Sequence, residues 1–179
     1  MTWNATSAPD KFWSNLASSA DGSKLLALGS DYMFVTNGFD IYTIVTSSRI
    51  YTSSNSGANW TSAAGAPTNA NWTSAASSAD GVKLAACSTS SIYTSTNAGD
   101  TWILRGAPNK QWNSIACSAD GTRLVAVAVK GGIHTSVDSG ATWIPTGAPA
   151  DLWWWSVASS GDRFTRPLQR TRRKLNRSA

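Results

Sequence analysis

Short apolar runs alternate with turn residues along most of the chain. Residues 124–129 are continuously apolar, which suits a strand buried on both faces. The shorter runs at 112–117 and 133–136 are rich in β-branched or aromatic residues, and Ala119-Asp120-Gly121 after the first of them is typical of a tight turn. No long segment has helical periodicity. The pattern therefore predicts an all-β chain of short strands.

The same succession of elements returns after 40 residues between Trp72 and Trp112, and after 41 between Ile92 and Ile133. Each unit contains a Trp, an Ala-Asp-Gly turn, an Ile-[Tyr/His]-Thr-Ser strand and a second Trp, in that order. A period of about 40–45 residues with four strands is typical of a propeller blade. We expect a partial β-propeller built of four-stranded antiparallel blades.

Towards the end of each unit lies an eight-residue stretch, S-x-[DN]-x-G-x-[TN]-W, which we call the box and which a fourth strand is expected to follow. The Asp or Asn side chain can hydrogen-bond nearby backbone, and the Gly accepts a positive φ without a Cβ clash. A large Trp closes the stretch, so the box is expected to turn the chain between two strands. The predicted structural residues are Ser53, Asn55, Gly57 and Trp60; Ser95, Asn97, Gly99 and Trp102; and Ser136, Asp138, Gly140 and Trp143.

Three boxes in phase resemble the Asp-box, or BNR repeat, of the sialidase-like β-propellers. The repeats carry this resemblance over roughly residues 1–160. The resemblance implies a propeller whose boxes lie in hairpin turns. It does not choose among the functions of that superfamily, because unrelated activities share one fold.

Three complete units are predicted, at residues 10–67, 68–108 and 109–149. Residues 1–9 align with the end of a unit and are expected to be the end of a truncated blade. Residues 150–160 are expected to start a further blade, and residues 161–179 to form a basic, disordered tail. Because closed propellers typically have about 4–8 blades, we expect a fragment of a longer propeller, or self-association that closes one.

The first unit carries an insertion at about residues 29–49. Its two apolar runs flank Asn37-Gly38, a strong signal for a two-residue hairpin turn. The insertion is predicted to be an extra hairpin, either a structural decoration or a binding loop.

The net charge of +5 resides in the tail. Residues 161–179 hold seven Lys and Arg against one Asp, whereas residues 1–160 hold eight against nine Asp. Nucleic acid is therefore not an expected partner of the repeats, only of the tail. We expect no membrane partner, because no apolar stretch is long enough to span a bilayer.

The sequence leaves the compartment and the redox state open. The start of the chain does not resemble a signal peptide, although an extracellular location stays open for a longer parent protein. Cys87 and Cys117 occur at different positions of their repeats and in apolar surroundings. They are interpreted as a disulfide or as two buried free thiols.

No catalytic residue is predicted. Sialidases resemble one another in an arginine cluster, an Asp, and a Tyr activated by a Glu, and this chain has no Glu. Glycosidases with two Asp carboxylates, as in propeller xyloglucanases, need two environments that separate the pKa values. Here Asp21, Asp80 and Asp120 repeat one turn position, and Asn replaces Asp138 in the other boxes.

No metal site or cofactor is predicted either. His134 is the one histidine of the chain and takes the place of Tyr51 and Tyr93 in the other units. A lone His is a poor zinc site, so we expect a strand surface residue.

Four Trp residues begin the units. They are Trp13, Trp72, Trp112 and Trp153, with Trp154 as the alternative for the last. An exposed ring of Trp could stack on sugars; the competing interpretation is packing between neighbouring blades.

The sequence thus favours a non-catalytic propeller module that binds a protein or a glycan. The alternative is a fragment of a glycoside hydrolase, sialidase-like or xyloglucanase-like. A resemblance to the propellers of photosystem II assembly factors is a third possibility that no residue singles out.

Overall fold

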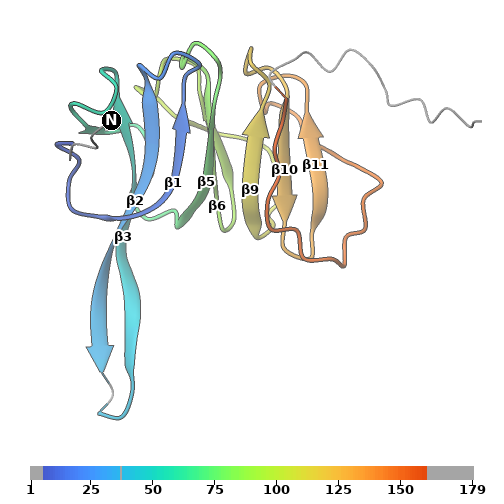
Figure 1. Cartoon of the computed structure of the whole chain (residues 1–179). Helices are drawn as coiled ribbons and strands as arrows, with labels where there is room; N and C mark the ends of the chain where they lie inside the picture. The colour runs from blue at the N-terminus through green and yellow to red at the C-terminus, as the bar shows by residue number, and fades with distance from the viewer. Residues whose placement is uncertain (1–5, 37, 161–179) are drawn as a thin grey trace, which may run out of the picture.

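The computed structural model describes residues 6–36 and 38–160, and within them all regular structure is β (Figure 1). The strands are β1 (Phe12–Ser18), β2 (Leu25–Thr36), β3 (Ile41–Ser53), β4 (Thr61–Ser62), β5 (Trp72–Ser77), β6 (Leu84–Ser88), β7 (Ile92–Ser95), β8 (Ile103–Leu104), β9 (Trp112–Cys117), β10 (Leu124–Ala128), β11 (Gly132–Ser136) and β12 (Ile144–Pro145). No described helix is long and apolar enough to cross a membrane.

The strands form three four-stranded antiparallel sheets in chain order, β1–β4, β5–β8 and β9–β12, which we call blades 1, 2 and 3. They stand side by side in Figure 1, each sheet facing the next. The expectation of an all-β partial propeller with four-stranded antiparallel blades is confirmed. The tail predicted at residues 161–179 and most of the half-blade at 1–9 lie outside the described residues.

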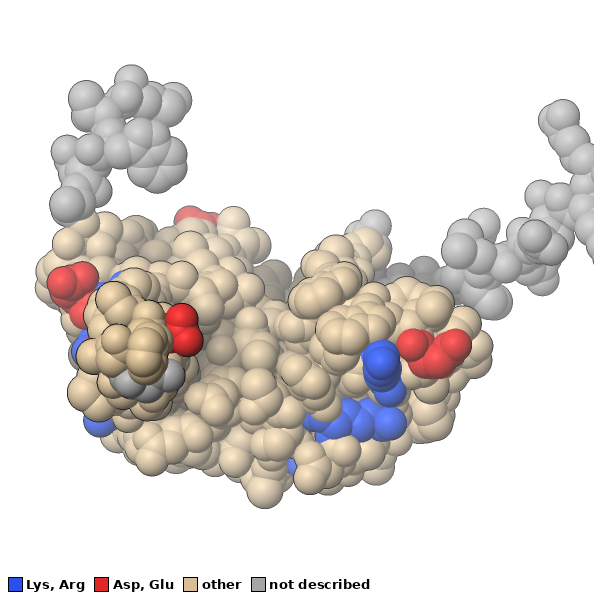
Figure 2. Space-filling model, turned by 90° about the horizontal axis from the view of Figure 1, so that it is seen from below, with Lys and Arg blue, Asp and Glu red and all other residues tan. Residues whose placement is uncertain are grey.

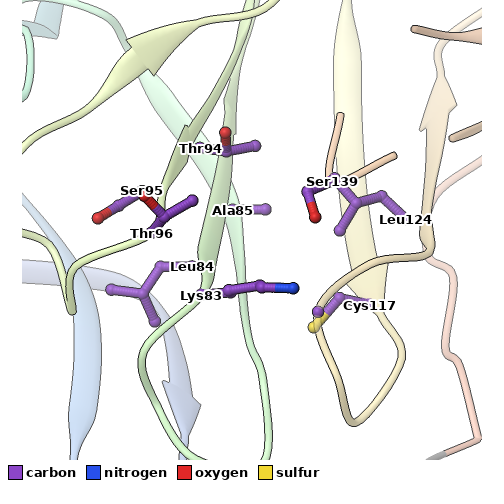
Figure 3. A pocket seen from close by; sticks show the side chains of 10 residues that line it. Lys83, Leu84, Ala85, Thr94, Ser95, Thr96, Cys117, Leu124 and Ser139 are labelled. Carbon is purple, nitrogen blue, oxygen red and sulfur yellow. The ribbon is translucent and has the colours of Figure 1, made fainter. Parts of the chain in front are cut away.

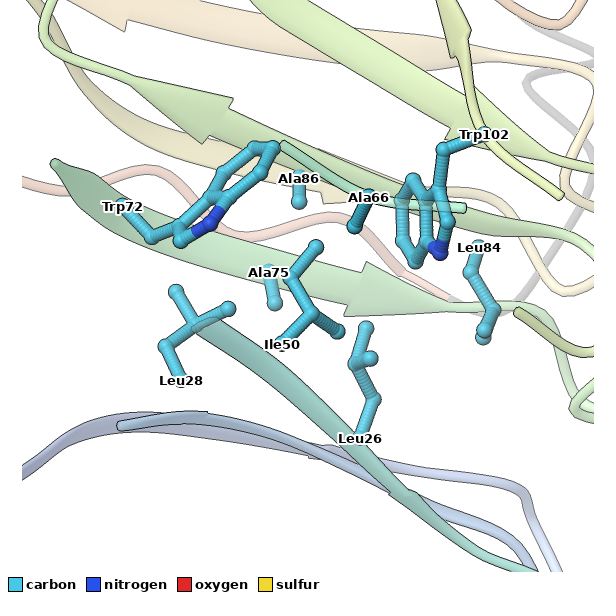
Figure 4. Packing of buried hydrophobic residues seen from close by; sticks show 9 residues of the cluster. All are labelled: Leu26, Leu28, Ile50, Ala66, Trp72, Ala75, Leu84, Ala86 and Trp102. Carbon is cyan, nitrogen blue, oxygen red and sulfur yellow. The ribbon is translucent and has the colours of Figure 1, made fainter. Parts of the chain in front are cut away.

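Apolar side chains join neighbouring blades. Between blades 1 and 2 the buried cluster consists of Leu26, Leu28, Ile50, Ala66, Trp72, Ala75, Leu84, Ala86 and Trp102 (Figure 4). A second cluster, between blades 2 and 3, contains Cys87, Ile92, Trp112 and Ile115 among others. Each fully buried Leu or Ile contributes roughly 1.5–3 kcal/mol of hydrophobic free energy. The core is therefore a series of joints between sheets, and each sheet needs its neighbours.

One hydrogen bond recurs at every joint. The Ala75 N–H donates to Asn15 Oδ1 at 2.9 Å, and the Ile115 N–H donates to Ser74 Oγ at 3.3 Å. The Val157 N–H donates in the same way to Ser114 Oγ at 3.2 Å. Residues 150–160 thus lie against blade 3 where the first strand of a further blade would lie, with one isolated bridge, Val129↔Trp153, in place of a ladder.

The predicted insertion is an antiparallel two-stranded extension of β2 and β3. Its register runs from Tyr32↔Val45 to Thr36↔Ile41, and an irregularity between Asp31 and Tyr32 marks its base. We call its described residues, 31–36 and 38–47, the ribbon. In Figure 1 the ribbon projects away from all three sheets. At its base the Lys11 ammonium pairs with the Asp31 carboxylate at 2.6 Å.

Candidate functional site

The three boxes share the hydrogen bonds of their serine and of their Asp or Asn, whereas the indole N–H of the closing Trp donates to the box glycine carbonyl only in the second and third boxes. In the third, Ser136 Oγ donates to Asp138 Oδ1 at 2.7 Å and accepts from the Gly140 N–H at 2.9 Å. The glycine adopts a φ of 85°, and Ser139 before it a φ of 56°. Ser53 and Ser95 hold Gly57 and Gly99 in the same way, at 2.9 Å each. The box side chains are thus occupied in holding their own turn.

Asp and Asn accept the same backbone hydrogen bond in this turn. The Thr142 N–H donates to Asp138 Oδ1 at 2.9 Å, and the Thr101 N–H donates to Asn97 Oδ1 at the same distance. Hydrogen bonds from Thr142 and Ser136 lower the pKa of Asp138 to about 2. This carboxylate is ionised at neutral pH, so it is unsuited to donate a proton as a general acid.

The acids of the Ala-Asp-Gly turns are held similarly. Ser78 Oγ donates to Asp80 Oδ1 at 2.5 Å, and Ser118 Oγ donates to Asp120 Oδ1 at 2.6 Å. Hydrogen bonds from serine and from the turn backbone lower the pKa of Asp80 and Asp120, and lower that of Asp21 to about 2. None of these three carboxyls has the raised pKa that a catalytic acid needs.

The structure contradicts the stacking role for Trp72 and Trp112. Their exposed fractions are 5% and 0%, against 40% for Trp13. Each buried ring lies in a joint with the preceding blade, which is the packing alternative. Trp13 is exposed because no described sheet covers that face of blade 1. It contacts Trp60 and Tyr51, at centroid distances of 6.0 and 5.2 Å.

Trp154, rather than Trp153, takes the repeated Trp position. Thr73 Oγ1 donates to the Trp112 carbonyl at 3.1 Å. In the corresponding place Asn113 Nδ2 donates to the Trp154 carbonyl at 3.2 Å and to the Trp155 carbonyl at 2.9 Å. Trp153 instead stacks on Trp155 with ring centroids 5.7 Å apart. The sequence left Trp153 and Trp154 as alternatives for this position, because three consecutive Trp residues fit the repeat. The bond from the Val157 N–H to Ser114 Oγ corresponds to that from the Ile115 N–H to Ser74 Oγ, three residues after Trp112, and therefore favours Trp154.

His134 was expected on the surface and is buried instead. Its ring lies edge-on to Trp112, with centroids 5.2 Å apart, and Nε2 lies 3.2 Å from the Gly131 carbonyl oxygen. Burial lowers the pKa of His134. The expectation failed because His134 lies beside Trp112 in the joint between blades 2 and 3, where side chains of a middle strand are covered by the neighbouring blade. A polar residue type in such a strand does not imply an exposed site. No cluster of three or more metal-ligating side chains occurs among the described residues.

Both cysteines are free thiols. Cys87 is buried in the joint between blades 2 and 3, and its sulfur lies 3.3 Å from Thr73 Oγ1. Burial raises the pKa of Cys87 and Cys117 to about 11. Neither thiol is a nucleophile at neutral pH, because the thiolate is the reactive form.

The two crevices between neighbouring blades on the side of the boxes are smaller than a typical ligand pocket. The crevice between blades 2 and 3 is lined by Lys83, Leu84 and Cys117, among others, and has a volume of about 10 Å³ (Figure 3). That is room for about one water molecule. The equivalent crevice between blades 1 and 2, beside Lys24 and Thr52, holds about 240 Å³, still below the roughly 300–1,000 Å³ typical of ligand pockets.

The ribbon carries the largest group of exposed apolar side chains among the described residues. One face presents Tyr32, Phe34, Ile41 and Val45, and the other presents Met33, Val35, Tyr42 and Ile44. The exposed fractions of Phe34, Ile41 and Met33 are 68%, 77% and 53%. An antiparallel ribbon surrounded by water normally has one polar face. This one has none, so it is the best candidate for an interaction site.

Few charges accompany this surface. Figure 2 views the molecule from the side on which the ribbon projects, and charged side chains are sparse there. The ribbon holds Asp31 and Asp40 and no Lys or Arg. A hollow of about 530 Å³ lies where the ribbon meets blade 2. It is lined by Tyr32, Thr43, Ile44 and Val45 on the ribbon and by Asn71 and Thr89, among others, on the side of blade 2.

The sequence indicated a hairpin here but not its role as an apolar projection. Two consecutive runs without alternation, at residues 32–35 and 41–45, were the available signal. Such runs are equally typical of a strand buried on both faces, so the pattern alone could not tell a projecting ribbon from a core strand.

No family model and no curated protein matches the chain. Solved structures do. The Niastella koreensis GH74 enzyme matches 79% of this chain at 20% identity and a TM-score of 0.57, and the GH74 xyloglucanase from Xanthomonas campestris matches 75% at 17% identity and 0.53. YCF48, solved bound to a D1 peptide, matches 83% at 11% identity with a TM-score of 0.59.

GH74 is a seven-bladed β-propeller, and YCF48 is a β-propeller. The chain spans 18% of each GH74 chain and 46% of the YCF48 chain. At these identities the likeness shows the fold alone. It agrees with a partial propeller.

Proposed function

We propose that this chain is a non-catalytic propeller repeat module that binds a protein, and that the ribbon is its binding element. The observation that carries the proposal is the exposure of apolar side chains on both faces of the ribbon. An isolated two-stranded hairpin is marginally stable in water at best. Contiguous exposed apolar surface of this kind is typical of interaction sites, and a partner would stabilise the ribbon by covering it.

The chemistry of the carboxylates supports a non-catalytic role. Asp21, Asp80, Asp120 and Asp138 each accept hydrogen bonds within their own turn. Asp31 pairs with Lys11 and accepts from Ser47 Oγ at 2.6 Å. The pKa of each of these five groups is lowered. A glycosidase needs one carboxyl whose pKa is raised.

We also propose that the boxes are Asp-box, or BNR, repeats of a longer propeller. The shared Ser, Asp or Asn, Gly and Trp positions and their common hydrogen bonds support this assignment. In all three blades the box lies between the third and fourth strands, as expected for a repeat that turns a hairpin.

A glycoside hydrolase fragment is the second candidate, favoured by the two GH74 neighbours in fold. Glycan binding without hydrolysis would use the exposed rings of Trp13 and Trp153. Both candidates predict affinity for a polysaccharide that does not depend on the ribbon.

Deleting residues 31–47 tests the proposal. The deletion leaves Gly29-Ser30-Ser48-Arg49 between the paired residues Leu28 and Ile50. This link has the same length as Ser88-Thr89-Ser90-Ser91 between the paired residues Cys87 and Ile92 of blade 2. The blades are therefore expected to fold, as judged by far-UV circular dichroism and thermal melting. Both proteins are immobilised and exposed to a lysate of the source organism, and retained proteins are identified and rebound in pure form.

We expect at least one purified protein, a second copy of this chain included, to bind the wild type and not the deletion variant. Equal binding to both variants would contradict the role of the ribbon. Hydrolysis of xyloglucan by the wild type, measured in parallel, would contradict the non-catalytic role.

A further inference from the structure

The edge of β3 that faces away from β2, which we call the outer edge, is open along the ribbon. Within blade 1 this edge pairs with β4, and Ser48 forms a parallel bridge with Asn69. Along residues 41–47, β2 is the only described strand that pairs with β3, and residues 41–46 are exposed. Alternate residues of this stretch therefore direct their N–H and C=O groups away from β2, as on any sheet edge.

The sequence of this edge favours strand pairing. Residues 41–47 read Ile-Tyr-Thr-Ile-Val-Thr-Ser and contain neither Pro nor a charged residue, the residues that commonly protect an exposed edge. The outer edge of β2 is covered at its base, because Lys11 pairs with Asp31 and the Phe12 ring lies edge-on to Tyr32 with centroids 4.8 Å apart. The ribbon thus offers β3 as its more open edge.

The hollow lies along this outer edge. It is lined by the consecutive β3 residues Thr43, Ile44 and Val45, whose side chains alternate between the two faces of the strand. Its opposite wall continues from the segment that occupies the edge at Ser48, since residues 68–69 lead directly to Asn71. In Figure 1, β3 is the cyan strand of the ribbon, on the side nearer blade 2.

Backbone hydrogen bonds hold the two walls of the hollow in place. The Ser48 N–H donates to the Thr68 carbonyl at 3.0 Å, and the Trp72 N–H donates to Ser48 Oγ at 3.2 Å. On blade 2 the Thr89 N–H donates to the Asn71 carbonyl at 3.2 Å. The hollow and the base of the open edge therefore keep a fixed relation, which lowers the cost of binding a ligand across both.

We infer that the partner of the ribbon contributes an extended peptide segment, which adds as a strand to the outer edge of β3 and places an uncharged side chain in the hollow. Alternating N–H and C=O groups along an edge are matched by the backbone of another extended chain. The residues that line the hollow carry no charge, so a charged side chain there would lose its hydration without a partner. This inference rests on the proposed function, in which the ribbon binds a protein, and it names the form of the segment bound.

The first test uses random linear dodecapeptides displayed on phage and selected on the complete 179-residue chain. We expect a synthesised peptide from this selection to bind the wild type and not the variant that lacks residues 31–47. N-methylation of the peptide at every second position in turn should raise the dissociation constant about tenfold or more, because those amides donate to β3. N-methylation at the intervening positions should leave it within a few-fold.

Amide hydrogen exchange, followed by NMR, identifies the edge that is used. When the peptide binds, we expect slower exchange at alternate residues of 41–45, whose N–H groups point away from β2. The amides of residues 32–36 that point away from β3 should keep their exchange rates. Slower exchange at those β2 amides instead would overturn the inference.

A pair of substitutions in one turn tests the hollow. Thr89→Trp fills the hollow from blade 2 without changing the ribbon, and we expect it to raise the dissociation constant of the peptide about tenfold or more. Ser90→Trp is the matched control, because Ser90 is exposed, follows Thr89 and does not line the hollow. It should leave binding within a few-fold. Far-UV circular dichroism and thermal melting show whether both variants remain folded.

The inference would be overturned if no peptide bound in a ribbon-dependent way, if N-methylation had the same effect at all positions, or if both Trp variants weakened binding equally. None of these results touches the proposed function, which is judged separately by ribbon-dependent binding of a purified protein. A wild-type dimer in light scattering, lost on deletion of residues 31–47, would assign the edge to a second copy instead. Sedimentation with phosphatidylcholine vesicles, lost on the same deletion, would assign the ribbon to lipid.

Discussion

At the scale of single residues, His134 and its counterparts show how neighbours decide the environment of a side chain. Tyr51 lies edge-on to Trp13, Tyr93 to Trp72, and His134 to Trp112, with centroids 5.2–5.3 Å apart. The sequence predicted this correspondence from the repeat. It could not predict the burial of His134, which depends on the packing of blade 2 against blade 3.

His134 should make stability depend on pH. Its pKa is lowered by burial, so the unfolded chain binds more protons than the folded one below about pH 6.5, and stability falls as the pH drops. His134→Tyr, the residue of the other two blades, should remove this part of the dependence. Urea unfolding at pH 7.5 and 5.5 measures it, and an unchanged difference between the two values in the variant would exclude His134 as the cause.

At the scale of elements, the local structure of the box was the feature best predicted from the sequence. Its glycine requirement follows from a positive φ at Gly57, Gly99 and Gly140, and its Asp or Asn accepts backbone hydrogen bonds. These are local interactions, and local interactions repeat wherever the eight residues repeat. The ribbon was predicted as a hairpin for the same reason, from its turn. The ribbon projects into solvent because no other described element packs against its tip. A local sequence pattern holds no information about such packing.

The box should tolerate loss of charge but not loss of its serine. Asp138→Asn keeps the acceptor used in the other boxes, and we expect a change in unfolding free energy within about 0.5 kcal/mol. Ser136→Ala leaves the buried Gly140 N–H without its acceptor and should cost about 1–3 kcal/mol. Urea unfolding at pH 7.5 distinguishes them; a larger cost for Asp138→Asn would mean that the carboxylate charge matters.

At the scale of the whole molecule, the described chain is a stack in which each sheet contacts only its neighbours, as in repeat proteins generally. The period and the four-strand unit predicted this arrangement. The sequence did not reveal which Trp positions would be covered, because Trp13 and Trp72 are alike in sequence and differ only in the presence of a preceding blade.

The same substitution should therefore have unequal effects along the stack. Trp72→Ala removes a buried ring from the joint between blades 1 and 2 and should cost about 3–5 kcal/mol. Trp13→Ala removes a ring that is 40% exposed and should cost distinctly less. Both are measured by urea unfolding, and equal costs would show that the face bearing Trp13 is covered in solution.

The hydrogen bond that recurs between blades has a consequence for how such a chain can grow. Blade 2 supplies the acceptor Ser74 to the blade after it and the donor Ala75 N–H to the blade before it. Blade 3 likewise carries both halves, the Ile115 N–H as donor and Ser114 as acceptor. A duplicated unit inserted between two others could therefore form this hydrogen bond with both neighbours. A gene for such a protein can lengthen by whole units without requiring a new kind of contact between blades.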